Sequence, residues 1–225
     1  MNIRKLHDWN IDYEAARLLQ LDFSSRIIFR EIGDVKYVAG VDCSTEKKST
    51  QIWAAVVVYD LLNHKVIEES TFRTETNFPY IPGLLSFREG PAVLEAIRRL
   101  SVEPDIFIFD GHGIAHPRNF GIASHIGLWL EKPAIGCAKS RLVGSAIQPA
   151  KAAGSMESLF FNEREVGLLL RTKDNVKPLW ISPGHLVNIR DSADIVLKCC
   201  LRHRMPEPTR LAHIAVNRFR TSLSL

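Results

Sequence analysis

A carboxylate that follows a buried strand marks the stretch of this sequence best suited to chemistry. Residues 106–109 form a continuous apolar run, and Asp110 comes directly after it, with Gly111 and Gly113 close behind. A short run that is apolar on both faces predicts a strand buried in an α/β sheet. Ligands bind at the carboxyl edge of such sheets, where glycines let the backbone approach them. Asp110 is therefore a candidate site residue, although a turn that Asp110 merely caps explains the same pattern equally well.

A second carboxylate, Asp42, lies in another apolar run, residues 38–44, where it has no obvious structural reason to be. If the strands that carry Asp42 and Asp110 are neighbours, their carboxylates meet at one edge of the sheet. Such a pair either shares a proton or binds a hard cation through oxygen ligands. Mg²⁺ fits best, because it takes one or two carboxylates, keeps several waters and bridges to substrate phosphate.

Glu89 and a histidine are candidates to complete this site. Glu89 falls in the first turns of a helix predicted over residues 84–100, and a solvated glutamate that answers the helix dipole is the simpler interpretation. Zinc is less suitable than Mg²⁺, because His112 and His116 lie in a loop with glycine and proline and not on a helix. A serine hydrolase is excluded, since the sequence has no Gly-x-Ser-x-Gly motif.

The elements that must position these residues alternate between helices and strands. Hydrophobic spacing predicts helices over residues 12–28, 84–100, 121–131, 189–202 and 209–222, and strands over residues 37–43, 51–59, 66–72, 106–109, 133–138, 165–172 and 178–182. Short polar breaks make the first three strands antiparallel neighbours, and the strand–helix–strand order of residues 106–138 predicts a parallel crossover. We therefore expect an α/β mixed sheet with antiparallel first three strands and a parallel remainder, flanked by helices.

Three further stretches have no regular pattern of their own. Residues 77–83 contain two prolines and a glycine, which predicts a stiff loop that holds Tyr80 and Ile81 outward. A connection packed over the core explains the same loop equally well. Residues 144–160 are poorly patterned and are expected to form a variable excursion, and residues 182–185 (SPGH) are expected to form a tight turn that presents His185.

Size and composition favour one cytoplasmic domain. With 225 residues and 46% hydrophobic content, the chain can bury one large core, and we expect a single domain over residues 1–225. No apolar run approaches the roughly 20 residues of a membrane span, and the N-terminal residues lack a signal-peptide pattern. Four cysteines without paired metal spacing predict reduced thiols: Cys43, Cys137, Cys199 and Cys200. We expect a monomer with no membrane contact.

The net charge is only +4, but basic residues gather near the C-terminus. From residue 198 onward, Glu207 is the only acidic residue among these basic ones: Lys198, Arg202, Arg204, Arg210, Arg218 and Arg220. Such a cluster is the expected footprint of phosphate binding, although a solvated basic helix produces the same cluster.

Short blocks follow one another in a fixed order along almost the entire sequence. They are Val41-Asp42, residues 79–83 (PYIPG) running into residues 87–89 (FRE), residues 110–113 (DGHG) with 115–118 (AHPR), residues 121–125 (GIASH), residues 136–139 (GCAK) and residues 206–210 (PEPTR). Together these blocks resemble the endonuclease V family, deoxyinosine-directed nucleases of ribonuclease H-like fold. Cys43 and Cys137 depart from the residues usual in the family, but they replace no functional group.

The resemblance implies a role for residues in each block. The implied catalytic set is Asp42, Glu89, Asp110 and His213, with Asp42 and Asp110 as the metal ligands. The implied nucleic-acid contacts are Pro79, Tyr80, Ile81, Pro82, His116, Lys139 and Arg210. The first four of these form a wedge that separates the strands while the lesion base is turned out of the duplex. Turning a base out costs a few kcal/mol, and less when the base is mismatched. The implied base pocket consists of Gly83, Leu85, Gly111, Gly113, Ile122 and Gly136.

The implied reaction is Mg²⁺-assisted hydrolysis of the second phosphodiester bond 3′ to the deaminated base, and Mn²⁺ is expected to substitute for Mg²⁺. The expected partner is DNA that contains deoxyinosine or other deaminated bases, and the nick would initiate DNA repair. The same fold and metal site would also serve an endoribonuclease that cuts inosine-containing single-stranded RNA, since only contacts to the 2′-hydroxyl separate the two substrates. A protein that binds deaminated bases without cutting is disfavoured, because no expected metal ligand is missing.

Overall fold

The computed structural model describes residues 1, 3–46 and 49–222. Its strands are β1 (Tyr37–Thr45), β2 (Gln51–Asp60), β3 (Lys65–Glu75), β4 (Ile106–Phe109), β5 (Ala134–Ala138), β6 (Met156–Phe161), β7 (Arg164–Leu170) and β8 (Leu179–His185). Its helices are α1 (Tyr13–Ser24), α2 (Leu85–Arg98), α3 (Ile122–Leu130), α4 (Ile189–Lys198) and α5 (Glu207–Ser222). The strands form one eight-stranded sheet in the order β3-β2-β1-β4-β5-β8-β7-β6. None of these helices is long and apolar enough to cross a membrane.

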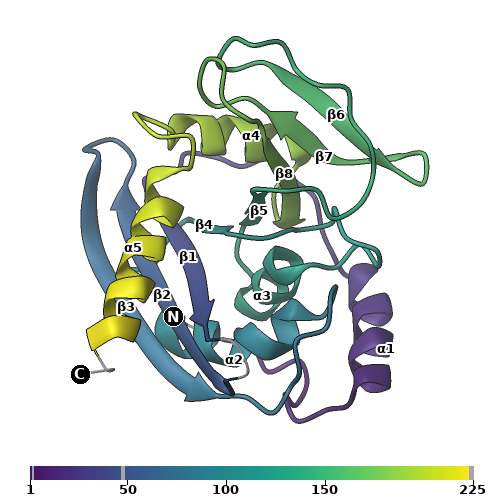
Figure 1. Cartoon of the computed structure of the whole chain (residues 1–225), viewed down its shortest axis with the longest axis vertical. Coiled ribbons are helices and arrows are strands. Elements are labelled where there is room, and N and C mark those ends of the chain that lie inside the picture. The colour runs from purple at the N-terminus through teal and green to yellow at the C-terminus, as the bar shows by residue number, and fades with distance from the viewer. Residues whose placement is uncertain (2, 47–48, 223–225) are drawn as a thin grey trace.

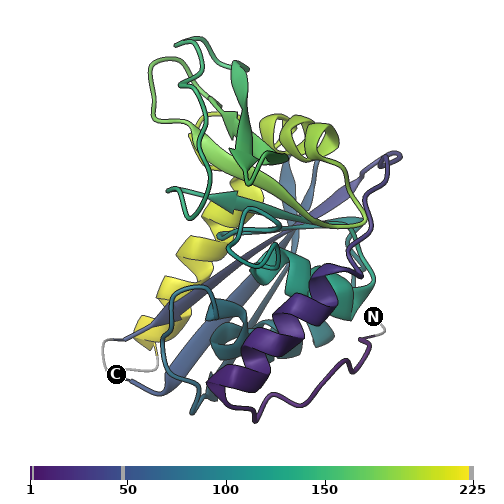
Figure 2. The same cartoon turned by 90° about the vertical axis from the view of Figure 1, so that its right-hand side faces the viewer.

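Helices cover both faces of this sheet, and β2 is apolar throughout because both of its faces are buried. Ile52, Ala54 and Val56 pack in the core cluster that contains α2 and α3 residues. Trp53 and Ala55 alternate with them and pack against α5 on the other face. Figure 1 shows α5 lying across β1 to β3, and Figure 2 shows α1 and α2 on the opposite side. Burial of both faces therefore explains the absence of polar alternation in β2.

The expected antiparallel and parallel pairings around β1 are confirmed. β1 pairs antiparallel with β2, and β2 pairs antiparallel with β3. β1 also pairs in parallel with β4, and β4 with β5. The register of the β1–β4 pair places Val41 opposite Phe109. The residues that follow, Asp42 and Asp110, are therefore neighbours, as the sequence predicts.

The expectation of a parallel remainder is wrong for the last three strands. β8 pairs antiparallel with β5, β7 with β8, and β6 with β7. β6 and β7 form a hairpin with a short connection, seen at the top of Figure 1, and such connections join antiparallel strands. Only the two pairs that flank β4 are parallel in the described sheet.

Two irregular stretches expected from the sequence are in fact parts of strands. Residues 156–160 belong to β6, so only the earlier part of the stretch 144–160 is an excursion. Residues 182–185 do not form a tight turn but complete β8, and His185 is buried there with 3% of its surface exposed. Proline is tolerated in β8 because the pairing with β5 shifts register next to Pro183.

Gly40 sets how closely α5 approaches the sheet. A β-carbon at this position would lie 2.0 Å from the backbone carbon of Pro208, in the first turn of α5. Only glycine permits this approach of helix to strand. Since Gly40 precedes Asp42 by one pleat of β1, the same contact aligns α5 with the acidic edge of the sheet.

Candidate active site and nucleic-acid interface

Three carboxylates gather where β1 and β4 meet the start of α2. Burial, followed by the charge of Asp110, raises the pKa of Asp42. Burial, followed by the charges of Asp42 and Asp110, raises the pKa of Glu89 to about 8. Among the described residues no hydrogen bond reaches the Glu89 carboxylate, and the neighbouring Arg88 donates to Phe78, Thr45 and Ser49. Glu89 is therefore not the solvated helix residue that the sequence favoured, but a member of the acidic group.

His213 reaches this group from α5. Its Nδ1 lies 2.7 Å from Oδ2 of Asp42. Asn217, one turn further along α5, places its Nδ2 3.2 Å from Nε2 of His213 and donates to the His213 carbonyl at 2.8 Å. An amide donor at Nε2 leaves the proton of a neutral imidazole on Nδ1, where it donates to Asp42. Asp42 and Asn217 together fix the orientation of His213.

Lys139 extends from the end of β5 toward the second carboxylate. Its Nζ forms an ion pair with Oδ2 of Asp110, and Lys139 is half-exposed. Lys139 therefore lies where it can contact both the acidic group and a phosphate that approaches it.

The acidic group has the donor chemistry of a site for a hard divalent cation. Carboxylate oxygens are the ligands that Mg²⁺ and Mn²⁺ take, and a cation would offset the repulsion that raises the pKa of Glu89. The neighbouring thiol, Cys43, offers no soft ligand, because burial raises its pKa well above the ordinary value. Across residues 1, 3–46 and 49–222, no three His, Cys, Asp or Glu side chains are close enough to form a metal shell by themselves. Water and substrate phosphate would supply the remaining ligands.

A cavity of about 360 Å³ lies beside the acidic group. It is bounded by the loop before α2, the loop after β4, the start of α3 and the segment after β5. Of the expected site residues, these line it: Tyr80, Ile81, Pro82, Gly83, Leu85, Asp110, Gly111, His116, Ile122 and Lys139. Asp42, Glu89 and His213 lie outside its lining, so the chemistry sits at the edge of the cavity.

Gly113 and Gly136 do not line this cavity, but they pack behind its wall. A β-carbon at Gly136 would lie 2.3 Å from the backbone nitrogen of Gly113, and one at Gly113 would lie 2.0 Å from the carbonyl oxygen of Pro183. The two glycines thus allow three backbone segments to touch. Gly113 and Gly136 therefore support the wall of the cavity and do not face its interior.

The loop before α2 carries an exposed aromatic tip on two fixed ends. Tyr80 is 69% exposed, whereas Phe78 is 7% exposed and packs beside Phe87. The Phe78 carbonyl accepts a hydrogen bond of 2.6 Å from Arg88, and the Leu84 amide donates to Ile81. A stiff projecting tip fits the expected wedge better than a connection folded over the core.

His116 has a different environment from that of a phosphate contact. It is 3% exposed, and burial lowers its pKa to about 3. Its Nδ1 accepts from the Arg118 amide, so the proton of the neutral ring is on Nε2, which lies 2.9 Å from the Gly83 carbonyl. His116 therefore supports the loop from below.

The basic residues of α5 are engaged with carboxylates. Arg210 lies 2.6 Å from Oε2 of Glu207, and Arg218 forms an ion pair with Glu69. Each arginine would have to share its N–H donors between this carboxylate and a phosphate. The basic cluster is therefore partly an internal charge network, which neither a phosphate footprint nor a solvated basic helix describes in full.

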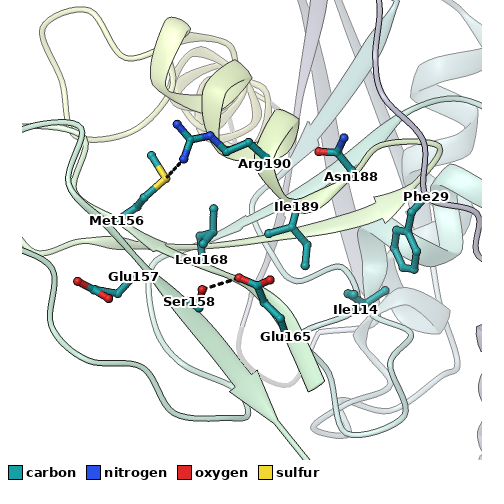
Figure 3. Close-up of a pocket in the computed structure, with 10 residues that line it drawn as sticks. All are labelled: Phe29, Ile114, Met156, Glu157, Ser158, Glu165, Leu168, Asn188, Ile189 and Arg190. Carbon is teal, nitrogen blue, oxygen red and sulfur yellow. Dashed lines mark hydrogen bonds between the residues drawn. The ribbon is translucent and has the colours of Figure 1, made fainter. Parts of the chain in front are cut away.

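A larger cavity, of about 720 Å³, lies away from the acidic group. Figure 3 shows its lining, drawn from β6, β7, the start of α4 and Phe29, with Glu165 hydrogen-bonded to Ser158 at 2.5 Å. Only Ile114 connects it to the loop after β4. Because it shares no lining residue with the smaller cavity, volume alone does not identify the reaction site.

Three supporting residues were not identified from the sequence: Gln20, Arg118 and Asn217. The position of Asn217, four residues after His213 on one helix face, was a usable signal. Gln20 and Arg118 meet only through the tertiary fold, so no local pattern pairs them.

Comparisons with known proteins agree along the whole chain. The sequence model of the family described as Endonuclease V matches residues 22–214. Endonuclease V of Kosmotoga olearia is 44% identical over 222 residues, covering 98% of this chain and 97% of the relative. The crystal structure of Endonuclease V from Streptomyces avermitilis has a TM-score of 0.92 at 36% identity and covers 100% of both chains. That of Ciona intestinalis Endonuclease V in complex with a 24mer DNA containing an inosine followed by a ribo-adenosine has a TM-score of 0.81 at 23% identity, over 94% of this chain and 100% of that one. The expected ribonuclease H-like fold is thereby confirmed.

Proposed function

This chain belongs to the endonuclease V family of nucleases, and from that membership we propose that it cuts DNA at the second phosphodiester bond 3′ to deoxyinosine. The observation that carries the proposal is the acidic group of Asp42, Asp110 and Glu89 beside a cavity of about 360 Å³ whose rim bears Tyr80. The Ciona relative was crystallised with inosine-containing DNA, which supports the same lesion here. The nick would initiate DNA repair.

Mg²⁺ is the cofactor we propose, with Mn²⁺ as a substitute. Asp42 and Asp110 would hold the ion, since they come from adjacent strands and supply hard oxygen ligands. When bound, the ion acidifies water and neutralises charge that develops on the phosphate. Glu89 lies beside these two carboxylates, whose charges help to raise its pKa. Once the ion offsets those charges, the Glu89 carboxylate would lose its proton more easily and could accept one from the attacking water.

His213 and Lys139 supply positive charge or protons on either side of the carboxylates. His213 is held by Asp42 on one nitrogen, and its other nitrogen faces Asn217. Lys139, already paired with Asp110, is half-exposed and can rotate toward a phosphate oxygen. Both groups would stabilise charge during hydrolysis of the phosphodiester.

The cavity would receive the base after it leaves the duplex. Tyr80 would fill the gap in the stack, while the backbone near Gly83, Gly111 and Ile122 would read the purine edge. Gly83 and Gly111 present only backbone there, which suits an uncharged base. We further propose that the chain acts as one domain, as a monomer, in the cytoplasm.

The test is incubation with an end-labelled duplex that contains one deoxyinosine, with and without Mg²⁺, followed by mapping of the nick. We expect one nick, at the second phosphodiester 3′ to the lesion, that requires the metal and leaves 3′-hydroxyl and 5′-phosphate ends. A matched duplex with adenine at the same position is the control. Equal cutting of both duplexes would contradict the proposal, and faster cutting of a matched single-stranded RNA would favour the endoribonuclease.

A further inference from the structure

One backbone carbonyl in the wall of the cavity, that of Gly83, has three side-chain nitrogens within hydrogen-bond distance. The Gly83 oxygen lies 3.0 Å from Nε2 of Gln20, 2.9 Å from Nε2 of His116 and 2.8 Å from Nη2 of Arg118. A carbonyl has two lone pairs, so three converging donors hold its position from several directions. Gly83 itself has φ of 80°, which other residues adopt only with strain.

Gln20 connects this carbonyl to the segment before α3, a second part of the cavity wall. Its Nε2 donates also to the Phe120 carbonyl at 2.9 Å, and its Oε1 accepts from Nε of Arg118 at 2.5 Å. Phe120 precedes the start of α3, where Ile122 lines the cavity. Gln20 is 1% exposed, so these three bonds are made without competition from bulk water.

Glutamine suits this place because of its donor pattern. One planar amide offers two hydrogens to two carbonyls and one oxygen to an arginine. A glutamate would turn acceptors toward both carbonyls, and an apolar side chain would leave both carbonyls with fewer donors. Hydrogen bonding, and not side-chain volume, therefore explains why a glutamine occupies position 20.

We propose that Gln20 is a positioning residue that sets the width of the base pocket, and through it the preference for a flipped hypoxanthine over ordinary bases. The Gln20 clamp, defined as Gln20, Arg118 and His116 around the Gly83 carbonyl, ties the wedge loop to the start of α3. The two walls that face a flipped base are then held at a fixed separation. This inference rests on the proposed function, since it assigns a cause to the selectivity of that site.

The alternative is that Gln20 only secures α1 to the protein. Asp12 provides a matched control, because its side chain caps α1 through the Ala15 amide at 2.8 Å and makes no contact with the clamp. Asp12→Ala should therefore loosen α1 without changing the pocket. Gln20→Met keeps an unbranched side chain of similar length and removes every hydrogen bond of the amide.

The experiment compares Gln20→Met, Asp12→Ala and the unchanged enzyme. For each, kcat and KM are measured on the deoxyinosine duplex and on the matched adenine duplex, together with the melting temperature. We expect Gln20→Met to lower the ratio of kcat/KM for the two substrates about tenfold, mainly by raising KM on the inosine duplex, and Asp12→Ala to leave the ratio unchanged. An unchanged ratio in Gln20→Met, with a lowered melting temperature like that of Asp12→Ala, would overturn the inference.

Two additions keep the test decisive. Arg118→Lys removes a second donor to the same carbonyl. It should also lower the ratio of kcat/KM for the inosine and adenine duplexes, and it replaces Gln20→Met as the test if that variant does not fold. Amide hydrogen exchange should quicken over residues 79–84 and 119–122 in Gln20→Met while residues 106–109 stay protected, and uniform protection would overturn the clamp. If the unchanged enzyme does not prefer the inosine duplex, the proposed function fails, and exchange alone then decides whether the clamp exists.

Discussion

Asp42 and Asp110 lie side by side on adjacent strands, and their charges, after burial, raise the pKa of Glu89 to about 8. Asp42→Ala or Asp110→Ala should abolish cleavage in Mg²⁺, because each would remove one of the two proposed metal ligands. Each change also relieves repulsion, so the free energy of unfolding should hold or rise. Nicking assays and denaturant unfolding of both variants check this. Near-normal nicking by either variant would show that the substituted residue is not a metal ligand.

The pair formed by His213 and Asn217 leads to a graded prediction. His213→Ala should slow cleavage by about 10² to 10⁴, the usual contribution of a positioned proton-transfer group. Asn217→Ala leaves the imidazole in place but loosens its tautomer and orientation, so we expect a loss of about tenfold. Single-turnover rates at saturating enzyme measure both effects. A larger loss in Asn217→Ala than in His213→Ala would mean that the asparagine acts on the substrate directly.

The sequence identified side chains whose position follows from one strand or one motif, and missed those defined by tertiary contacts. Asp42 and Asp110 could be predicted because strand ends collect at one sheet edge. For Glu89 the helix pattern alone favoured a solvated residue, and only the family resemblance placed it in the catalytic set. Burial at the meeting of α2 with β1 is invisible in a helix pattern. Gln20 carried no signal, since its partners lie on Gly83 and Phe120, far along the chain.

For the loop that carries Tyr80, one substitution distinguishes a wedge that enters the duplex from a mere connection packed over the core. Tyr80→Ala should change the free energy of unfolding by less than about 0.5 kcal/mol, since the ring is exposed. If the ring fills the gap left by a flipped base, binding to the inosine duplex should weaken by about 1 to 3 kcal/mol, or roughly five- to a hundredfold. Affinity for an inosine in a wide bubble should fall less, because less prying is needed. Equal losses on both substrates would keep the contact but remove the wedge.

The close approach of α5 to β1 leads to a prediction about Gly40. Gly40→Val should lower the free energy of unfolding by about 1 to 3 kcal/mol, because its side chain would meet the backbone of Pro208. Cleavage should fall more than stability explains, since a displaced α5 carries His213 away from Asp42. Gly33→Val is the control, because a β-carbon there meets nothing within 4 Å. Activity and unfolding curves of the two variants, measured together, check this.

Strands with strong apolar runs could be predicted from the sequence, and the last three were harder for physical reasons. β6 lies at the edge of the sheet and has only one strand partner among the described residues, so its burial is mixed and its pattern weak. β8 contains Pro183 and Gly184, which predict a turn in isolation. A register shift beside β5 accommodates them, and only the neighbouring strand shows this.

Considered as one folded unit, the protein should lose stability in mild acid. Burial lowers the pKa of His116 to about 3 and that of His185 to about 4, and it lowers the pKa of His125 well below the ordinary value. Between about pH 6.5 and pH 4 the unfolded chain binds protons that the folded protein does not. Each of these histidines should therefore lower the free energy of unfolding by about 1.4 kcal/mol per pH unit as the pH falls. Glu89 acts oppositely, because its raised pKa favours the folded state as the pH falls from about 8 to 4.5.

Urea unfolding at pH 7.5, 6 and 5 tests the acid dependence. His185→Gln should reduce the slope of the unfolding free energy against pH by about one proton relative to the unchanged protein. The same slope in both proteins would show that His185 titrates alike in the folded and unfolded states.

During synthesis the strands next to Asp42 and Asp110 are made early, and His213, which contacts Asp42, is made late. Asp42 and His213 are 171 residues apart, and α5 must dock on β1 before they meet. Chains grow from the N-terminus at about 5 to 20 residues per second, so a nascent chain holds Asp42 for many seconds before residues 207–222 exist. An unfinished or C-terminally clipped chain would carry Tyr80 and the carboxylates but lack the histidine. With the role proposed for His213, such a chain would cut nucleic acid more slowly than the finished protein.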